Sequence, residues 1–175
     1  YPASFMLVAS MNPCPCGYYT HPDKECLCGA NVVQRYLNKI SGPLLDRIDI
    51  QIEIIPVPFE RLSEKGFAES SNQIRERVVR ARVRQEERFE NEEGVFCNAQ
   101  MSPKLLTKYA SPDEAGLKLL KMAMEKFCLS ARASDRILKV SRTIADLDNS
   151  DIILSKHLAE AISYRNLDRE NWASH

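Results

Sequence analysis

The fold is decided by a run of alternating residues, Ile48-Asp49-Ile50-Gln51-Ile52-Glu53-Ile54-Ile55. Isoleucine at every second position, with polar side chains between, is typical of a β-strand that buries one face. Pro56 and Pro58 end it, because proline cannot donate to a β-ladder. An earlier apolar run, Phe5 to Ser10, predicts a buried parallel strand that ends at a polar loop containing Asn12. With a short helix expected over Asn31 to Lys39, this part of the chain is predicted to be α/β.

The sequence becomes helical after a linker at residues 59–69. Ser70-Ser71-Asn72 is predicted to cap a helix over Gln73 to Phe89, whose apolar residues have helical spacing. Further helices are predicted over Pro103 to Tyr109, Ser111 to Phe127, Ser130 to Leu147 and Ser155 to Tyr164. The helix over Ser111 to Phe127 is interpreted as opening on a capping box, Ser111-Pro112-Asp113-Glu114. The predicted organisation is an α/β remnant at residues 1–58 with a Cys-rich insertion, an all-α domain at residues 70–169 and a tail at residues 170–175.

Composition excludes some classes of protein. The 24 basic and 24 acidic side chains cancel, so any contact with nucleic acid must come from a local patch. The helix over Gln73 to Phe89 carries six arginines, interleaved with glutamates, and is interpreted as solvated or subunit-facing. No apolar run approaches the roughly 20 residues that span a bilayer. The first ten residues lack a basic n-region and an initiator Met, which favours an internal part of a longer protein over a signal peptide.

The six cysteines are unevenly placed. Four of them form two Cys-X-Cys pairs, Cys14 with Cys16 and Cys26 with Cys28, while Cys97 and Cys128 stand alone. A secreted disulfide scaffold spreads its cysteines through a shorter chain, so a reducing cytoplasm is expected. The four clustered thiols could bind a structural zinc ion, with His21 as a substitute ligand. Reduced cysteines in a compact loop are the alternative.

Three polar residues could carry chemistry. Asn12 could orient a water or touch a phosphate, or simply cap its own loop. Arg47 has the planar fork that suits phosphate oxygens, but it could equally pair with Asp46 or Asp49. Arg132, with Arg136 and Lys139 on the same helical face, could meet an anion, or form a solvated face.

Five segments, taken together in order, carry a family resemblance: Met11-Asn12-Pro13-Cys14-Pro15-Cys16-Gly17, Ser41-Gly42-Pro43-Leu44-Leu45-Asp46-Arg47-Ile48-Asp49, Leu129-Ser130-Ala131-Arg132-Ala133, Arg142-Thr143-Ile144-Ala145-Asp146-Leu147 and Tyr164-Arg165-Asn166-Leu167-Asp168-Arg169. Over nearly its whole length the chain resembles the magnesium-chelatase-like AAA+ ATPases of the ComM type. The resemblance implies the end of an AAA+ core, from the sensor 1 strand onward, followed by a helical lid.

The resemblance also implies roles for single residues. Asn12 matches sensor 1, which places the attacking water beside the γ-phosphate. Arg47 matches the arginine finger that reaches into the neighbouring subunit's ATP, and Arg132 matches sensor 2, acting either within its own subunit or on a neighbour. The full-length protein is then expected to be a homo-oligomeric, hexameric ring that uses ATP and Mg²⁺ to drive DNA branch migration.

The chain contains no Gly-x-x-x-x-Gly-Lys-[Ser/Thr] motif and no apolar strand ending in paired acids before Phe5. On its own it is therefore expected neither to bind ATP tightly nor to hydrolyse it. Two alternatives from other classes remain: a chelatase subunit that assists insertion of Mg²⁺ into a porphyrin, and a free-standing zinc-stabilised binding module.

Overall fold

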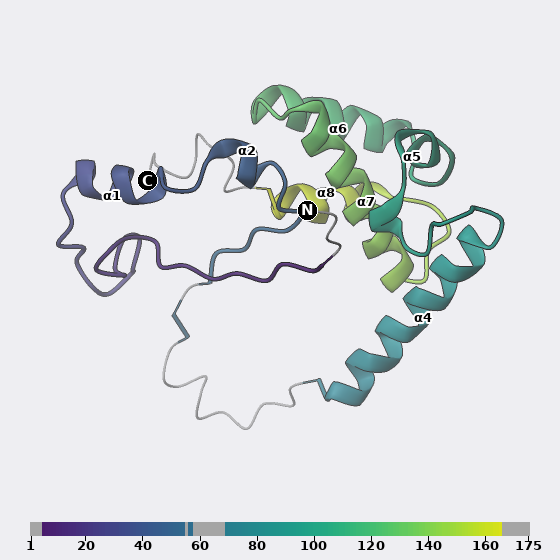
Figure 1. Cartoon of the computed structure of the whole chain (residues 1–175), viewed down its shortest axis with the longest axis horizontal. Helices are drawn as coiled ribbons and strands as arrows, with labels where there is room; N and C mark the ends of the chain where they lie inside the picture. The colour runs from purple at the N-terminus through teal and green to yellow at the C-terminus, as the bar shows by residue number, and fades with distance from the viewer. Residues whose placement is uncertain (1–4, 55, 58–68, 166–175) are drawn as a thin grey trace.

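The computed structural model describes residues 5–54, 56–57 and 69–165. A helical domain is built around α7 (Ala131–Leu147), a helix of 17 residues (Figure 1). Against α7 pack α4 (Ser71–Phe89), α5 (Pro103–Tyr109) and α8 (Ser155–Ser163), and α6 (Glu114–Lys126) packs on α8. A short 3-10 helix, Asn98–Gln100, also contacts α7. The predicted all-α domain is therefore confirmed.

Local capping explains where most of these helices begin. The Ser70 side chain accepts from the Gln73 N–H in a full capping box, Ser102 accepts from Leu105, and Ser130 accepts from Ala133. Such a cap satisfies a backbone donor that has no partner within the helix.

The predicted cap of α6 is wrong. The helix starts at Glu114, and Asp113 is its N-cap, accepting from the Gly116 N–H. The Ser111 hydroxyl donates instead to the Thr107 carbonyl, and Pro112 forms an isolated parallel bridge with Ile153. Both residues are therefore held in the preceding turn.

The core of the helical domain has two apolar clusters. One lies between α6, α7 and α8 and contains Leu120, Ala123, Ile137, Leu158, Ala161 and Ile162. The other joins α4, α5 and α7 and contains Phe89, Met101, Leu105, Leu106, Ala110, Ala145 and Ile153. Each fully buried Leu, Ile, Phe or Met contributes on the order of 2 kcal/mol, so this core determines how the helices pack.

A charged network lies inside this apolar core. The Asp146 side chain is fully buried and accepts hydrogen bonds from Arg88 and from Nδ2 of Asn98, the latter at 2.8 Å. Arg142, one turn earlier on α7, pairs with the same carboxylate at 3.0 Å. Burial lowers the pKa of Arg142, and the Asp146 charge opposes that effect. One buried carboxylate thus links α4, the 3-10 turn and α7.

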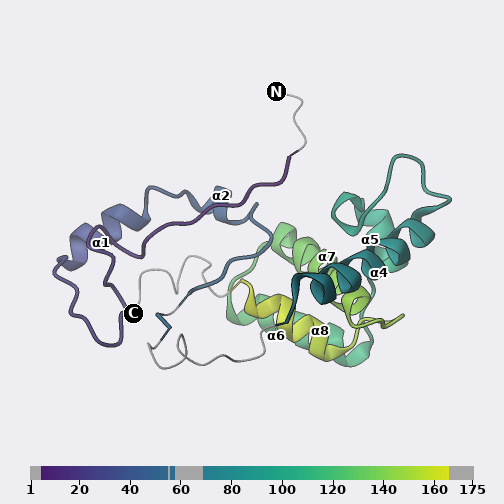
Figure 2. The same cartoon turned by 90° about the horizontal axis from the view of Figure 1, so that it is seen from below.

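The N-terminal part lies to one side of the bundle and is much less compact (Figures 1 and 2). It contains α1 (Ala30–Leu37) and the single turn α2 (Gly42–Leu45). The helix predicted over Asn31 to Lys39 is confirmed as α1. Between these helices and the bundle the backbone is extended.

The predicted sheet is not confirmed. Within residues 5–54 neither Phe5 to Ser10 nor the described part of Ile48 to Ile55 forms a β-ladder. Apart from the half-buried Ile48, their large apolar side chains are exposed, 83% for Val8 and 84% for Ile54. A strand is stable only beside another strand, and the described residues offer these segments none. Ile55, most of the predicted 59–69 linker, residues 166–169 and the 170–175 tail lie outside the described residues.

Among the helices of the described part, none is both long enough and apolar enough to cross a bilayer.

Candidate functional site

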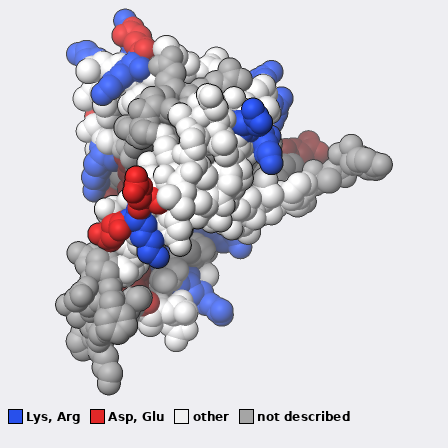
Figure 3. Space-filling view, turned by 90° about the vertical axis from the view of Figure 1, so that its left-hand side faces the viewer, with Lys and Arg blue, Asp and Glu red and all other residues white. Residues whose placement is uncertain are grey.

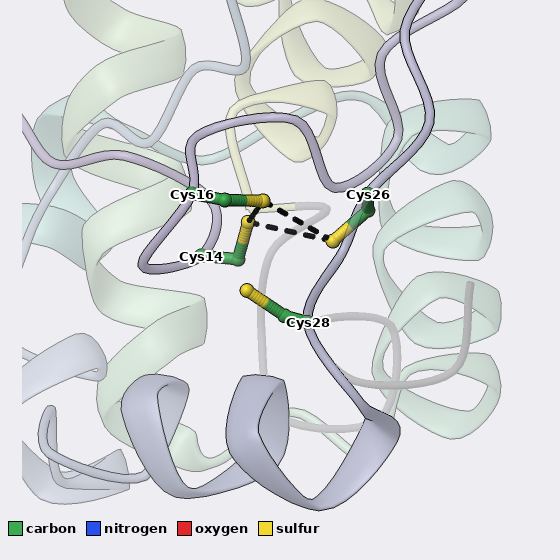
Figure 4. Close-up of side chains that lie close together, drawn as sticks. All are labelled: Cys14, Cys16, Cys26 and Cys28. Atoms are coloured by element: carbon green, nitrogen blue, oxygen red, sulfur yellow. Dashed lines mark hydrogen bonds between the residues drawn. The ribbon is translucent and has the colours of Figure 1, made fainter.

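Four cysteine side chains converge in the loop before α1 (Figure 4). Cys14 and Cys16 lie in a tight turn, in which the Gly17 N–H donates to the Cys14 carbonyl at 3.0 Å. Gly17 has a φ of 82°, which glycine adopts without strain. Cys26 and Cys28 approach from the other arm of the loop. The sulfur atoms of Cys14, Cys16, Cys26 and Cys28 all lie within 4.8 Å of one another.

The spacing of these sulfurs fits tetrahedral coordination. Sγ of Cys14 lies 3.3 Å from that of Cys16 and 3.7 Å from that of Cys26, and Cys16 and Cys26 are 3.5 Å apart. Four thiolates about 2.3 Å from one zinc ion would lie about 3.8 Å apart. The predicted substitute ligand is outside the group, because Nδ1 of His21 accepts the Asp23 N–H. The cluster can therefore hold a metal ion with cysteine ligands alone.

The protein around the cluster supports this arrangement. Cys14 is fully buried and packs with Val33 and Leu37 on α1, so the loop and the helix share one small core. The Tyr19 N–H donates to Sγ of Cys14 at 3.3 Å. Backbone donors to ligating sulfurs are the usual outer-shell partners of thiolate metal sites.

The thiols of Cys16 and Cys26 differ in acidity. Hydrogen bonds from the Tyr18 N–H and from Cys14 lower the pKa of Cys16 to about 6. The Cys28 N–H favours the Cys26 thiolate, but burial and the adjacent thiols of Cys16 and Cys14 outweigh it and raise the pKa of Cys26 to about 12. The Cys16 thiolate is thus favoured, whereas Cys26 resists ionisation unless a cation compensates its charge.

Arg47 lies two residues after the end of α2, and its side chain is exposed. Its guanidinium donates to the Pro43 carbonyl at 2.6 Å. The alternative of a salt bridge is not realised in the described residues: Asp49 pairs with Arg136, and Arg47 pairs with neither Asp46 nor Asp49. The charge of Arg47 is therefore available to an anion from outside.

The predicted basic face of α7 divides into three different environments. Arg136 pairs with Asp49, and Nζ of Lys139 donates to the Ala99 carbonyl at 2.9 Å. Arg132 is exposed on the first turn of the helix, and within the described chain its guanidinium has no hydrogen bond or ion pair. Of the three, Arg132 is the one that can meet a ligand.

Asn12 is exposed and lies beside the cysteine turn, its Cγ 4.0 Å from where a Cβ on Gly17 would stand. No contact joins Asn12, Arg47 and Arg132 to one another in the described residues. Sequence reasoning missed the Asp49–Arg136 pair, whose members are 87 positions apart. It also missed the Asp146 network, for which the i,i+4 spacing of Arg142 and Asp146 was a local signal.

Comparison with known proteins gives matches along the whole chain. The family profile described as magnesium chelatase, subunit ChlI C-terminal, matches residues 68–165, and the one described as magnesium chelatase, subunit ChlI, matches residues 1–62. The competence protein ComM of Haemophilus influenzae is 41% identical over 170 residues, which are 97% of this chain and 32% of that protein. YifB of Escherichia coli is 42% identical over 171 residues, with the same shares. The chain thus spans about a third of the length of these relatives.

Proposed function

Because the chain belongs to the magnesium chelatase ChlI family, we propose that it supplies the helical lid and a trans-acting arginine to a ring-shaped AAA+ ATPase that works on DNA. The observation that carries the proposal is the state of Arg47. It stands between two acids in the sequence, yet within the described residues its exposed guanidinium pairs with neither and donates a hydrogen bond to a backbone carbonyl. A structural ion pair would have neutralised it.

In this proposal each polar residue has a separate task. Arg47 reaches across the subunit interface and stabilises the charge that spreads over the γ-phosphate oxygens of the neighbouring subunit. Arg132, near the free N–H groups at the start of α7, holds phosphate oxygens from the lid. Asn12 orients the attacking water through its amide. When bound, MgATP supplies the phosphoryl group that is transferred to that water.

Two observations support the proposed DNA partner. One relative is named a competence protein, which points to DNA handling in that protein. On α4, Arg77 pairs with Glu69, Arg84 with Asp151 and Arg88 with Asp146. Three exposed arginines, Arg75, Arg80 and Arg82, have no such pair in the described residues. Figure 3 shows acidic and basic groups interspersed around a broad uncharged face, so any DNA contact must be local.

Stimulation of ATP hydrolysis tests this partner. We expect branched DNA to raise the ATPase rate of the full-length protein several-fold above that with linear duplex. The competing assignment is metal insertion into a porphyrin, as the family description suggests. An ATPase rate that DNA does not change, and that only a porphyrin-binding partner raises, would favour that assignment and contradict ours.

We also propose that the four clustered cysteines hold one structural Zn²⁺. The sulfur spacing and the backbone donor to Cys14 support it. Bound zinc would join the two arms of the loop and so fix the segment that begins at Asn12. It would take no part in the reaction, because a four-cysteine site leaves no open position for substrate.

Elemental analysis checks the zinc assignment. The purified chain, kept reduced, is expected to contain one zinc ion, and Cys14→Ser is expected to lose it. Cys128→Ser is the matched control, since Cys128 is exposed and far from the cluster in sequence. Zinc should also dissociate as the pH falls, because protons compete for the thiolates. Metal-free wild-type protein, or equal zinc in both variants, would overturn the assignment.

A further inference from the structure

The segment that carries Arg47 is attached to the helical domain. Asp49, two residues after Arg47, forms an ion pair with Arg136 on α7. Arg165, just beyond α8, donates to the Ile48 carbonyl. The Gln51 N–H donates to the Tyr164 carbonyl at 2.9 Å. These contacts join residues 48–51 to the second turn of α7 and to the C-terminal end of α8, about 90 to 120 positions further along the chain.

Two of the residues in these contacts are buried, unlike the members of an ordinary surface ion pair. Arg165 is only 3% exposed and Gln51 only 8%. The Gln51 side chain also turns back to the Leu45 carbonyl, Nε2 to O 3.1 Å, so it fixes the bend between α2 and the extended segment. The side chains of Arg136 and Asp49 are 29% and 55% exposed. Both residues can therefore be replaced without disturbing the core.

The position of Arg136 on α7 connects the Arg47 loop with Arg132. It lies one turn after Arg132 on the same face of α7, about 6 Å further along the helix axis. The same helix therefore carries Arg132 and holds the loop of Arg47. Arg47 lies two residues before Asp49, and Arg132 lies four residues before Arg136.

We propose that Asp49 and Arg136 are positioning residues that make the Arg47 loop and the lid move as one body. We call the Asp49–Arg136 pair, together with the Arg165–Ile48 hydrogen bond, the interdomain clamp. The inference rests on the proposed function in one respect: Arg47 must act on ATP for the clamp to affect turnover. A lid that moves on nucleotide binding or release would then carry its own finger towards or away from the neighbouring subunit.

The clamp itself is tested on this chain, independently of any ATPase. Asp49→Arg places two like charges together, and we expect the Gln51 amide to exchange its hydrogen about tenfold faster. Arg136→Asp should do the same, and the exchanged pair, Asp49→Arg with Arg136→Asp, should return to within about threefold of wild type. Glu69→Arg, which disrupts the comparably exposed Glu69–Arg77 pair, should leave Gln51 unchanged.

Turnover in the full-length protein tests the positioning role. Asp49→Arg should lower kcat for ATP hydrolysis at least tenfold with KM for ATP nearly unchanged, and the exchanged pair should recover most of kcat, because misplacing a catalytic group by about 1 Å costs up to roughly 10²-fold. Unchanged Gln51 exchange in both single variants overturns the clamp. Faster exchange without a change in kcat, where Arg47→Ala does abolish turnover, overturns the positioning role alone. If Arg47→Ala keeps full turnover, it is the proposed function that fails.

Discussion

Replacing Arg47 by alanine in the full-length protein is expected to lower ATP turnover by about 10³-fold while ATP still binds. A trans-acting arginine stabilises charge that develops during phosphoryl transfer, an effect worth 10³–10⁵ in rate. Ground-state binding is expected to depend on other groups, since among the described residues the Arg47 guanidinium donates to the Pro43 carbonyl and forms no ion pair. Steady-state hydrolysis and equilibrium binding of labelled ATP separate the two effects.

Two further variants make the Arg47 result specific. Arg47→Lys keeps the charge but loses the planar fork, so we expect it to recover only a small part of the rate. Arg35→Ala removes another exposed arginine of the N-terminal part, in the last turn of α1, and should leave turnover within about twofold. Turnover within threefold of wild type in Arg47→Ala would reduce Arg47 to a surface residue.

The second large effect is on stability. Asp146→Ala is expected to lower the free energy of unfolding of the helical domain by about 3–5 kcal/mol. The carboxylate is fully buried between Arg88 and Arg142, and its loss leaves two guanidinium groups with little compensation. The Asn98 amide would also lose an acceptor. Urea unfolding of the 175-residue chain, followed by circular dichroism, measures the change.

Asp151 provides the matched control for Asp146. It too is an aspartate paired with an arginine of α4, but its side chain is 94% exposed. Water screens such a pair, so Asp151→Ala should cost less than about 1 kcal/mol. A similar decrease in the free energy of unfolding in both variants would mean that burial of the Asp146 network contributes nothing to stability.

The helical half of the fold could be predicted from local sequence. The helix predicted over Pro103 to Tyr109 has these bounds in the structure, and the one predicted from Ser130 begins one residue later, at Ala131. Ser102 and Ser130 cap these helices, and such a cap involves only a few neighbouring residues. The start of α6 was misplaced because Ser111 and Asp113 are both good caps. A contact from Pro112 to Ile153, far along the chain, favours the second.

Long-range structure was harder to predict. Alternation at Ile48 to Ile54 specifies a strand only if another strand lies beside it. The described residues provide none, so Ile50, Ile52 and Ile54 stay exposed. The cysteine site was visible because its ligands are close in sequence, although spacing alone left zinc and reduced thiols open. Nothing local marked Asp49 as the partner of Arg136, so the basic face of α7 was predicted as one surface and proved to be three environments.

The central claim is that Arg47 acts on the ATP of a neighbouring subunit, and mixing two inactive variants tests it most directly. One full-length variant carries Arg47→Ala, and the other lacks the phosphate-binding lysine expected in the part of the full-length protein outside this chain. In a mixed ring, a subunit with an intact nucleotide site can receive Arg47 from its neighbour. We predict that an equal mixture regains about a quarter of wild-type ATPase activity, the chance that such subunits are adjacent in the required order. A mixture that stays as inactive as its components would contradict the claim.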